Sequence, residues 1–184
     1  PAPGSPPQVH GLDRLFEIAA DDATVVFSEV TLRDGWAAEY GGAIMSSSLA
    51  TVRVLDSALS GNGAGKTGGG IDNHFAGTVE VRDSTLRDNY AAEAGSALNN
   101  NRGGTMTVAD SVVTSNSAAD AGLDDALLGA GAIANNAELD ATGVLAVSDS
   151  QITENRAGGG RLGAGISNDG AGTVTVTDTI FRSN

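Results

Sequence analysis

The chain has 184 residues, a formal net charge of −13, no cysteine, 26 glycines and only 4% aromatic residues. The length suits one domain, and the missing cysteines exclude disulfides, thiolate metal sites and a cysteine nucleophile. One lysine and nine arginines cannot form the basic stripe that nucleic acid needs, and we expect no nucleic-acid partner. No apolar run approaches the roughly 20 residues of a membrane-spanning helix, so we expect no membrane insertion by this segment.

The chain begins with a proline-rich stretch. All four prolines lie in PAPGSPP, residues 1–7, so we expect residues 1–10 to be a tail or linker that stays outside any sheet. The next segment, GLDRLFEIAADDA at 11–23, allows a short helical turn or a strand that carries Phe16 and Ile18. We favour the strand, because TVVFSEVTLRDG follows it with the spacing of the later repeats.

A twelve-residue unit then recurs along the chain: TVRVLDSALSGN at 51–62, TVEVRDSTLRDN at 78–89, TMTVADSVVTSN at 105–116 and TVTVTDTIFRSN at 173–184. Aligned units end at Gly35, Asn62, Asn89, Asn116, Asn155 and Asn184, which are 27, 27, 27, 39 and 29 residues apart. A glycine-rich marker follows each of the first five, as GGAI at 41, GGGI at 68, GSAL at 95, GAGAI at 129 and GAGI at 163. Such internal repeats are typical of a solenoid.

Within each unit the apolar residues alternate with polar ones. Val52, Val54 and Leu59 recur as Val79, Val81 and Leu86, while Arg53 and Glu80 stand between them. A period of two is typical of strands with one buried face. We therefore predict an all-β solenoid of about six coils over residues 11–184, in which coils about 4.8 Å apart pair with each other and bury their apolar sides together. Segments 118–130, 135–143 and 156–165 lengthen the later intervals and are expected to be loops.

Stacking puts identical positions into ladders. We expect the amides of Asn62, Asn89, Asn116, Asn155 and Asn184 to form a structural ladder, each donating to the carbonyl of the next. We also expect Arg53 and Glu80, which share one position in successive coils, to form an ion pair.

The pairing of GGAI with an apolar-x-x-Asn unit (LSGN, LRDN, VTSN, ITEN and FRSN) resembles the repeats of chlamydial polymorphic outer-membrane proteins and of bacterial right-handed parallel β-helix proteins of cell surfaces. The resemblance covers residues 14–184. It implies a right-handed parallel β-helix with three strands per coil, exported, often as the passenger part of an adhesin or autotransporter. Only Phe181 supplies the phenylalanine of the FxxN motif, so the match is to the repeat class. The piece is expected to be a fragment of a longer protein.

One repeat position is acidic in every unit: Glu29, Asp56, Asp83, Asp110, Asp149 and Asp178. Carboxylates about 4.8 Å apart repel one another, and Ca²⁺, which takes carboxylate oxygens, would offset this. Asp56, Asp83 and Asp110 are therefore candidate calcium ligands. The other interpretation is that each aspartate caps a turn, and no other cofactor is expected.

Catalysis is the second chemical possibility. Asp34, Asp88 and Glu154 are expected near coil corners next to Arg33, Arg87 and Arg182, and glycosidases need paired carboxylates. These acids fall in non-adjacent coils. The histidines, His10 and His74, are far apart in the sequence and predict no metal site.

The sequence thus favours a non-enzymatic, extracellular or cell-surface β-helix module, either adhesin-like or structural. Its expected partners are a host protein or glycan, or further copies of itself through the solenoid ends, whose strand edges would pair. The alternative is a fragment of a polysaccharide lyase or glycoside hydrolase built on the same fold.

Overall fold

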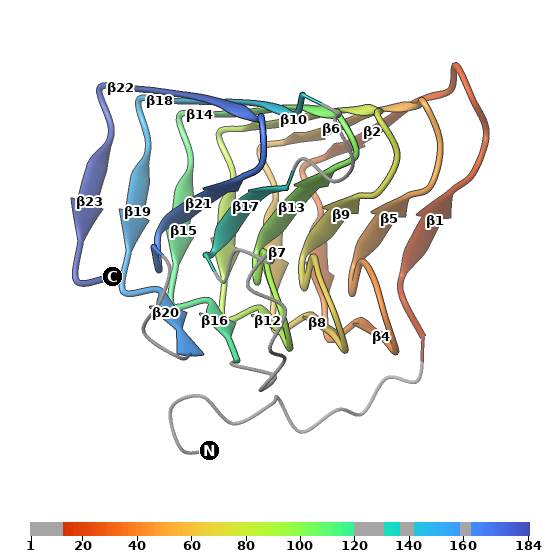
Figure 1. Cartoon of the computed structure of the whole chain (residues 1–184). Coiled ribbons are helices and arrows are strands. Elements are labelled where there is room, and N and C mark those ends of the chain that lie inside the picture. Colours follow the sequence, from red (N-terminus) through yellow and green to blue (C-terminus); the bar gives the residue numbers. More distant parts are fainter. Residues whose placement is uncertain (1–12, 120–130, 137–141, 159–162) are drawn as a thin grey trace.

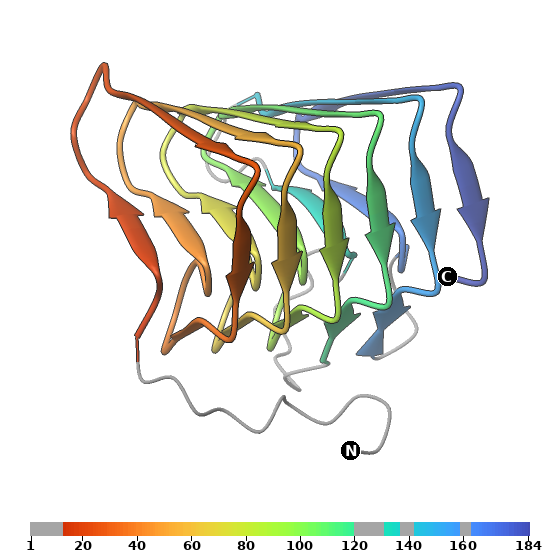
Figure 2. The same ribbon diagram turned by 180° about the vertical axis from the view of Figure 1, so that it is seen from behind.

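The computed structural model describes residues 13–119, 131–136, 142–158 and 163–184. The expected tail at 1–10, His10 and most of the three expected loops lie outside these residues. The described chain winds into a right-handed column of stacked coils, with β1 at one end and β23 at the other (Figures 1 and 2). All pairings between named strands are parallel and join successive coils, which confirms the all-β parallel solenoid.

Each coil contributes one strand to each of three six-stranded sheets, and every described coil except the last adds a shorter strand to a fourth, five-stranded sheet. The first sheet holds β1 (Phe16–Ile18), β5 (Ile44–Ser46), β9 (Ile71–Asn73), β13 (Leu98–Asn101), β17 (Ile133–Asn136) and β21 (Ile166–Asp169). The second holds β2 (Thr24–Ser28), β6 (Thr51–Leu55), β10 (Thr78–Arg82), β14 (Thr105–Ala109), β18 (Val144–Ser148) and β22 (Thr173–Thr177). The strand over Phe16 and Ile18 is thereby confirmed.

The third sheet holds β3 (Thr31–Arg33), β7 (Ala58–Ser60), β11 (Thr85–Arg87), β15 (Val112–Thr114), β19 (Gln151–Thr153) and β23 (Ile180–Arg182). The fourth holds two-residue strands: β4 (Trp36–Ala37), β8 (Gly63–Ala64), β12 (Tyr90–Ala91), β16 (Ser117–Ala118) and β20 (Arg156–Ala157). We number the coils from β1, β5, β9, β13, β17 and β21. The family resemblance implied three strands per coil, and the fourth, two-residue strand is additional; its second residue is an alanine, buried in the first four of these strands.

The core is a set of aliphatic rows that run along the column. Val52, Val79, Met106 and Leu145 form one row, and their neighbours two residues on form the next; all are essentially fully buried. Leu59, Leu86, Val113 and Ile152 close the core from the third sheet. Because strand side chains alternate in direction, this pairing in register places every repeated apolar residue inside.

The charged pair expected on the outer face of the second sheet is confirmed. Arg53 Nε donates to Glu80 Oε2 at 2.7 Å, and Arg82 Nε lies 3.7 Å from Glu80 Oε1. The hydrogen bond from Arg53, opposed by partial burial, holds the pKa of Glu80 below its ordinary value.

Because the pKa of Glu80 is lower in the folded protein than in the unfolded protein, the ion pair stabilises the fold at pH values above the unfolded-state pKa. This stabilisation is lost as the pH falls through the folded-state pKa of Glu80. Arg53→Ala should lower the free energy of unfolding at neutral pH by about 0.2–1 kcal/mol, the range for half-exposed pairs. The deficit should vanish well below the ordinary glutamate pKa of about 4.3. Urea unfolding across pH measures it, with Arg33→Ala as the exposed control; a deficit that persists in acid would show that Arg53 acts through packing alone.

Candidate functional site

The acidic repeat position forms the corner between the second and third sheets, which we call the acid corner (Glu29, Asp56, Asp83, Asp110, Asp149 and Asp178). All six residues have a positive φ, between 45° and 56°. This left-handed conformation is costly for most residues, and aspartate tolerates it better because its short polar side chain can bond locally. The backbone conformation of the corner therefore favours aspartate, which stands at five of the six positions.

The residue after each acid joins one coil to the next. Ser57 Oγ donates to Leu55 O at 2.6 Å and accepts the N–H of Val30 from the preceding coil at 3.1 Å. Ser84 Oγ accepts the N–H of Ser57 at 3.1 Å and Ser111 Oγ that of Ser84 at 3.1 Å. The hydroxyl, rather than the carboxylate, closes the turn, so the expected aspartate cap is replaced by a serine ladder.

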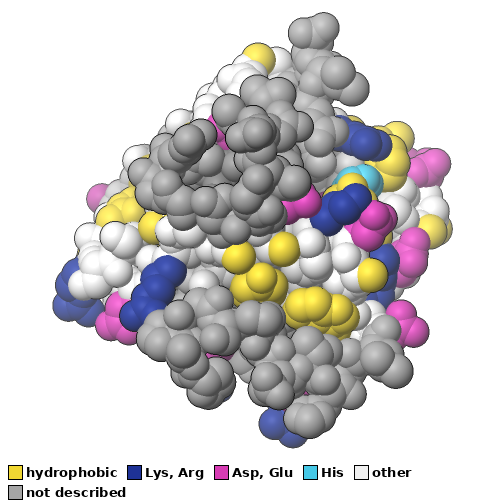
Figure 3. Space-filling model, turned by 60° about the horizontal axis from the view of Figure 1, so that its bottom comes forward, with side chains coloured by type: hydrophobic (Ala, Val, Ile, Leu, Met, Phe, Trp, Pro, Cys, Tyr) yellow, Lys and Arg dark blue, Asp and Glu magenta, His cyan; other side chains and the backbone are white. Residues whose placement is uncertain are grey.

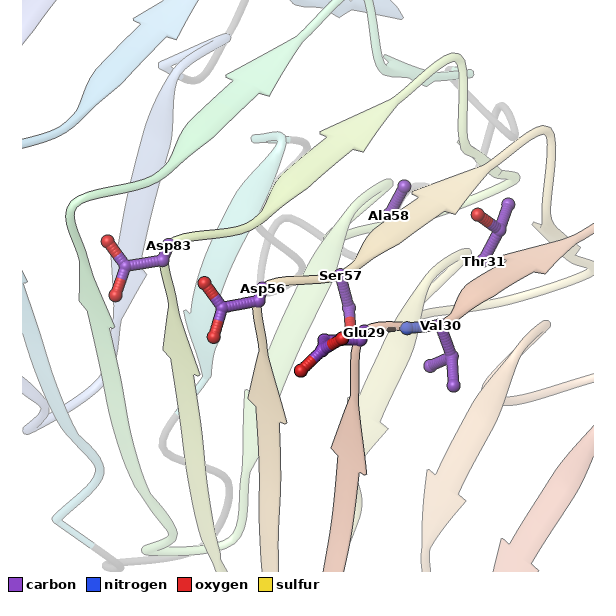
Figure 4. Close-up of a pocket in the computed structure, with 7 residues that line it drawn as sticks. All are labelled: Glu29, Val30, Thr31, Asp56, Ser57, Ala58 and Asp83. Atoms are coloured by element: carbon purple, nitrogen blue, oxygen red, sulfur yellow. Dashed lines mark hydrogen bonds between the residues drawn. The ribbon is translucent and has the colours of Figure 1, made fainter.

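The candidate calcium ligands lie on the outside of this corner. Glu29, Asp56 and Asp83 border an open hollow of about 430 Å³, and Figure 4 shows the carboxylates of Asp56 and Asp83 projecting outward from successive coils. Asp110 instead pairs with Arg82, whose Nη1 lies 2.9 Å from Asp110 Oδ2. Within the described ranges, no three acids or histidines come together as a metal-ligand group. Calcium binding here stays a prediction, and a calcium titration tests it.

The acids considered for catalysis occupy the next corner, between the third and fourth sheets. Asp34, Asp88 and Glu154 have φ values of 60°, 56° and 58°, and Gly61 and Ser115 take the same position in the coils between them. Two of them make exposed ion pairs with the arginine that precedes them, because Arg33 Nε lies 3.7 Å from Asp34 Oδ2 and Arg87 Nη1 lies 2.6 Å from Asp88 Oδ2. Coils two apart are separated by about 9.6 Å. These positions therefore share a left-handed turn, and a catalytic role for their acids stays the alternative prediction.

The five asparagines predicted as a ladder stand on this same corner, just inside the column. Asn62 Nδ2 donates to Asn89 Oδ1, Asn89 to Asn116 and Asn116 to Asn155, each at 3.0 Å, and Asn155 to Asn184 at 2.9 Å. Each Oδ1 also accepts the backbone N–H of the preceding member, and each Nδ2 also donates to a carbonyl of the preceding coil, as Asn89 does to Leu59 O at 3.1 Å. We call this the first amide ladder.

A second amide ladder, missed by sequence reasoning, follows the first sheet. Asn73 Nδ2 donates to Asn100 Oδ1, Asn100 to Asn135, and Asn135 to Asn168, each at 2.8 Å. Every member also donates to a glycine carbonyl that begins the path to the second sheet, as Asn73 does to Gly77 O at 2.8 Å. The signal was present, because each of these asparagines stands two residues after the last apolar residue of the glycine-rich marker.

The clearest non-repeated feature is an outward group of rings, which we call the aromatic corner (Trp36, Tyr40, His74, Phe75 and Tyr90). Trp36 and Tyr90 are half-buried on the fourth sheet, with centroids 6.2 Å apart and planes inclined by 13°. Both pair with Gly63, whose missing side chain lets the two rings approach across the coil between them. Apolar side chains gather on the described part of this face in Figure 3.

The rest of the aromatic corner lies along the first sheet, with Tyr40 before β5 and with His74 and Phe75 directly after β9. The Tyr40 ring centroid is 4.3 Å from that of His74, which in turn is 5.0 Å from that of Phe75. A cation stands at each end of this row: Lys66 Nζ lies 5.2 Å from the Tyr40 centroid, and Arg102 lies 4.8 Å from the Phe75 centroid. Cations over ring faces are attracted by the ring quadrupole.

Charged side chains lie beside the rings of the aromatic corner. Lys66 Nζ lies 2.7 Å from Glu39 Oε1, and this bond lowers the pKa of Glu39 and raises that of Lys66. On the following coil, burial raises the pKa of Glu93 despite the opposing effect of Lys66, and burial also raises the pKa of Tyr90. The surface thus carries both signs of charge beside half-exposed rings.

A buried carboxylate lies beneath the rings. Asp72 is fully buried, and its Oδ2 accepts hydrogen bonds from Thr67 Oγ1 and, at 3.1 Å, from Asn99 Nδ2. Its Oδ1 lies 3.3 Å from His74 Nδ1, and His74 is itself only 7% exposed. His74, dismissed as a metal ligand from the sequence, is therefore held between Asp72 and two aromatic rings.

No protein-family model matches the chain, and comparisons with curated proteins and with solved structures give no match. The comparisons therefore add no family to the β-solenoid repeat fold that the coordinates establish. The part of the chain that the structure describes also contains no helix long and apolar enough to cross a membrane.

The first amide ladder makes a direct prediction about stability. Asn89→Ala removes the acceptor of both Asn62 donors and leaves these buried N–H groups without partners, which should cost about 2–4 kcal/mol. Arg87→Ala, two residues away but exposed, should change the free energy of unfolding by less than about 0.5 kcal/mol. Thermal and urea unfolding of the two variants compare them; equal losses would mean that the amides contribute nothing specific.

Proposed function

We propose that this chain is a non-enzymatic, extracellular or cell-surface β-solenoid module of adhesin type, and that the aromatic corner is its ligand-binding surface. The observation that carries the proposal is the position of the rings. The only tryptophan and both tyrosines lie on the outside of the first three coils, whereas the core is filled by aliphatic residues and Phe27. A chain with 4% aromatic residues gains no core packing from these rings.

The scaffold supports a binding role. In-register coils fix the outward residues on a rigid column, and a site on strands is held more accurately than one on a loop. Trp36 and Tyr90 can offer ring faces to an apolar ligand surface, while Glu39 and Lys66 can exchange hydrogen bonds with polar groups around it. A glycan combines both characters, because a sugar ring has a face of C–H groups and a rim of hydroxyls. A glycan is therefore the ligand we propose first, and a host protein second.

The composition and the repeats support the proposed location of the protein at the cell surface. The GGAI marker and the apolar-x-x-Asn unit are similar to repeats of polymorphic outer-membrane proteins, which supports export and a place at the bacterial cell surface. The absence of cysteine and the charge of −13 are compatible with it. The alternative of a lyase or hydrolase rests on Asp34, Asp88 and Glu154, which stand at left-handed corner turns.

Glycan-array screening of the purified chain, followed by calorimetry on the best ligand, tests the proposal. We expect saturable binding without cleavage. Trp36→Ala and Tyr90→Ala should each weaken binding at least about tenfold, since a stacked ring contributes on the order of 1.4 kcal/mol or more.

Val26→Ala is the matched control, because Val26 is an apolar residue 50% exposed on the second sheet, away from the aromatic corner, and its binding should be unchanged. Binding that survives the loss of both rings would contradict the aromatic corner as the site. Turnover of any acidic polysaccharide in the same screen would favour the lyase or hydrolase instead.

A further inference from the structure

The buried carboxylate of Asp72 lies on the outer side of the first sheet. Side chains alternate along a strand, and because Ile71 belongs to the core cluster, Asp72 faces the other way. It is nevertheless fully buried, since the turn before β9 covers it: Gly68 has a φ of 69°, and a Cβ added there would lie 2.6 Å from Asp72 Cβ. A buried carboxylate is costly unless its oxygens are paired, so the partners of Asp72 decide what it does.

The two oxygens of Asp72 have different surroundings. Oδ2 accepts hydrogen bonds from Thr67 Oγ1 and Asn99 Nδ2. Oδ1 is buried without an aligned hydrogen bond from the described chain, and the same holds for Nδ1 of His74, which lies 3.3 Å from it. Two lone pairs facing each other at this distance would leave both buried atoms unsatisfied, whereas a proton on Nδ1 pairs them. We therefore place a proton on His74 Nδ1.

The other ring nitrogen of His74, Nε2, is left for a ligand. The side chain of His74 is 9% exposed, and Nδ1 has no part in this exposure. No residue in the described ranges makes a hydrogen bond to Nε2. In a neutral imidazole one nitrogen donates and the other accepts. A proton held on Nδ1 therefore leaves Nε2 with a free lone pair.

The neighbours of His74 limit what can reach Nε2. The ring planes of Tyr40 and Phe75 are inclined to that of His74 by 39° and 80°, with centroids 4.3 and 5.0 Å away. The nearest charged side chains, Lys66 and Glu39, already bond to each other. The small opening between two apolar rings suits a single hydroxyl rather than a bulky or charged group.

We propose that His74 is a specificity-determining residue of the aromatic corner, whose Nε2 accepts a hydrogen bond from one hydroxyl of the bound glycan. Asp72 is the positioning residue that keeps Nε2 in its acceptor form. This inference rests on the proposed function, because the aromatic corner must be the binding surface. A nearly buried acceptor rejects a ligand that lacks the matching donor, so His74 would select among sugars that the rings of Trp36 and Tyr90 bind alike.

The position of the ring proton can be measured without any ligand. The full chain with His10→Gln retains His74 as its single histidine, and ¹⁵N NMR of the ring at about pH 8, where an ordinary histidine is neutral, distinguishes the tautomers. We expect the proton on Nδ1. A proton on Nε2, whether in the neutral tautomer or in an imidazolium, overturns the proposal.

Asp72→Asn in the same chain tests the positioning role. The asparagine carboxamide can donate to Nδ1, so the ring proton should move to Nε2, which then ceases to accept. Asparagine suits this place, because Asn99 holds the paired position in the next coil and is also fully buried. A ring proton that stays on Nδ1 in this variant would show that Asp72 does not set the tautomer.

Binding of methyl glycosides of glucose, galactose, mannose and N-acetylglucosamine tests the contact itself. The sugar that binds should shift the Nε2 signal, and its analogue without the donating hydroxyl should bind at least about tenfold more weakly. Asp72→Asn should cause a similar loss. His74→Gln should bind nearly as well as the native chain, because its side-chain oxygen can replace the acceptor, and Asp72→Asn should cause little further loss in that background.

The outcomes separate this proposal from the proposed function. A sugar that shifts the signals of Trp36 and Tyr90, yet leaves Nε2 unchanged and binds the Asp72→Asn variant equally well, overturns the role of His74 while the aromatic corner stands. Equal losses from Asp72→Asn in the native and His74→Gln backgrounds would make Asp72 merely structural. Binding of no sugar would overturn the proposed function and the hydroxyl contact together, even with the ring proton on Nδ1.

Discussion

In-register parallel stacking is the constraint on which the rest of the molecule depends. A strand that slipped by one residue would turn its valines outward and its charged residues inward, so the register must be fixed at every interface. Here the corners fix it. Asparagine at one corner and serine at another each bond to their equivalents in the adjacent coils, and only the native alignment satisfies all of these buried groups.

The repeat explains why much of this was predictable. Val52, Val79 and Met106 recur every 27 residues, and within each unit apolar residues alternate with polar ones. The spacing of 27 defines the coil, and the alternation defines which side chains face inward and in what order the apolar rows lie. The ladder of Asn62, Asn89 and Asn116 could be predicted for the same reason. The second ladder was equally periodic, and it was missed because its asparagines follow the marker rather than end the twelve-residue unit.

The aromatic corner could not have been predicted in this way. Trp36 and Tyr90 are two coils apart, occupy a sheet whose strands have only two residues, and meet because Gly63 leaves the position between them empty. His74 illustrates the same limit, because its ring partner Tyr40 comes from an earlier coil and follows no repeat, although Asp72 lies only two residues before it. Repetition predicts the scaffold, while departures from it, which carry the specific chemistry, become visible only when the coils are stacked.

At the acidic positions, a requirement of the backbone can produce the same sequence pattern as a cation-binding site. Six carboxylates at one repeat position suggested a cation site, yet all six residues take a left-handed conformation that the corner requires. This conformation favours aspartate at five of the six positions, and Asp110 is also paired with Arg82. Asp34 and Asp88 take the same left-handed conformation, so one backbone constraint recurs at two corners of the column.

The most direct measurement of the central idea is hydrogen exchange of the asparagine side-chain amides by NMR. If stacked amides hold the register, the Nδ2 protons of Asn89 and Asn116 should exchange far more slowly than those of the terminal Asn184, and only through opening of the column. Exchange of Asn89 and Asn116 at the rate of solvent-exposed amides would contradict the account, because the ladder would then not be closed in solution.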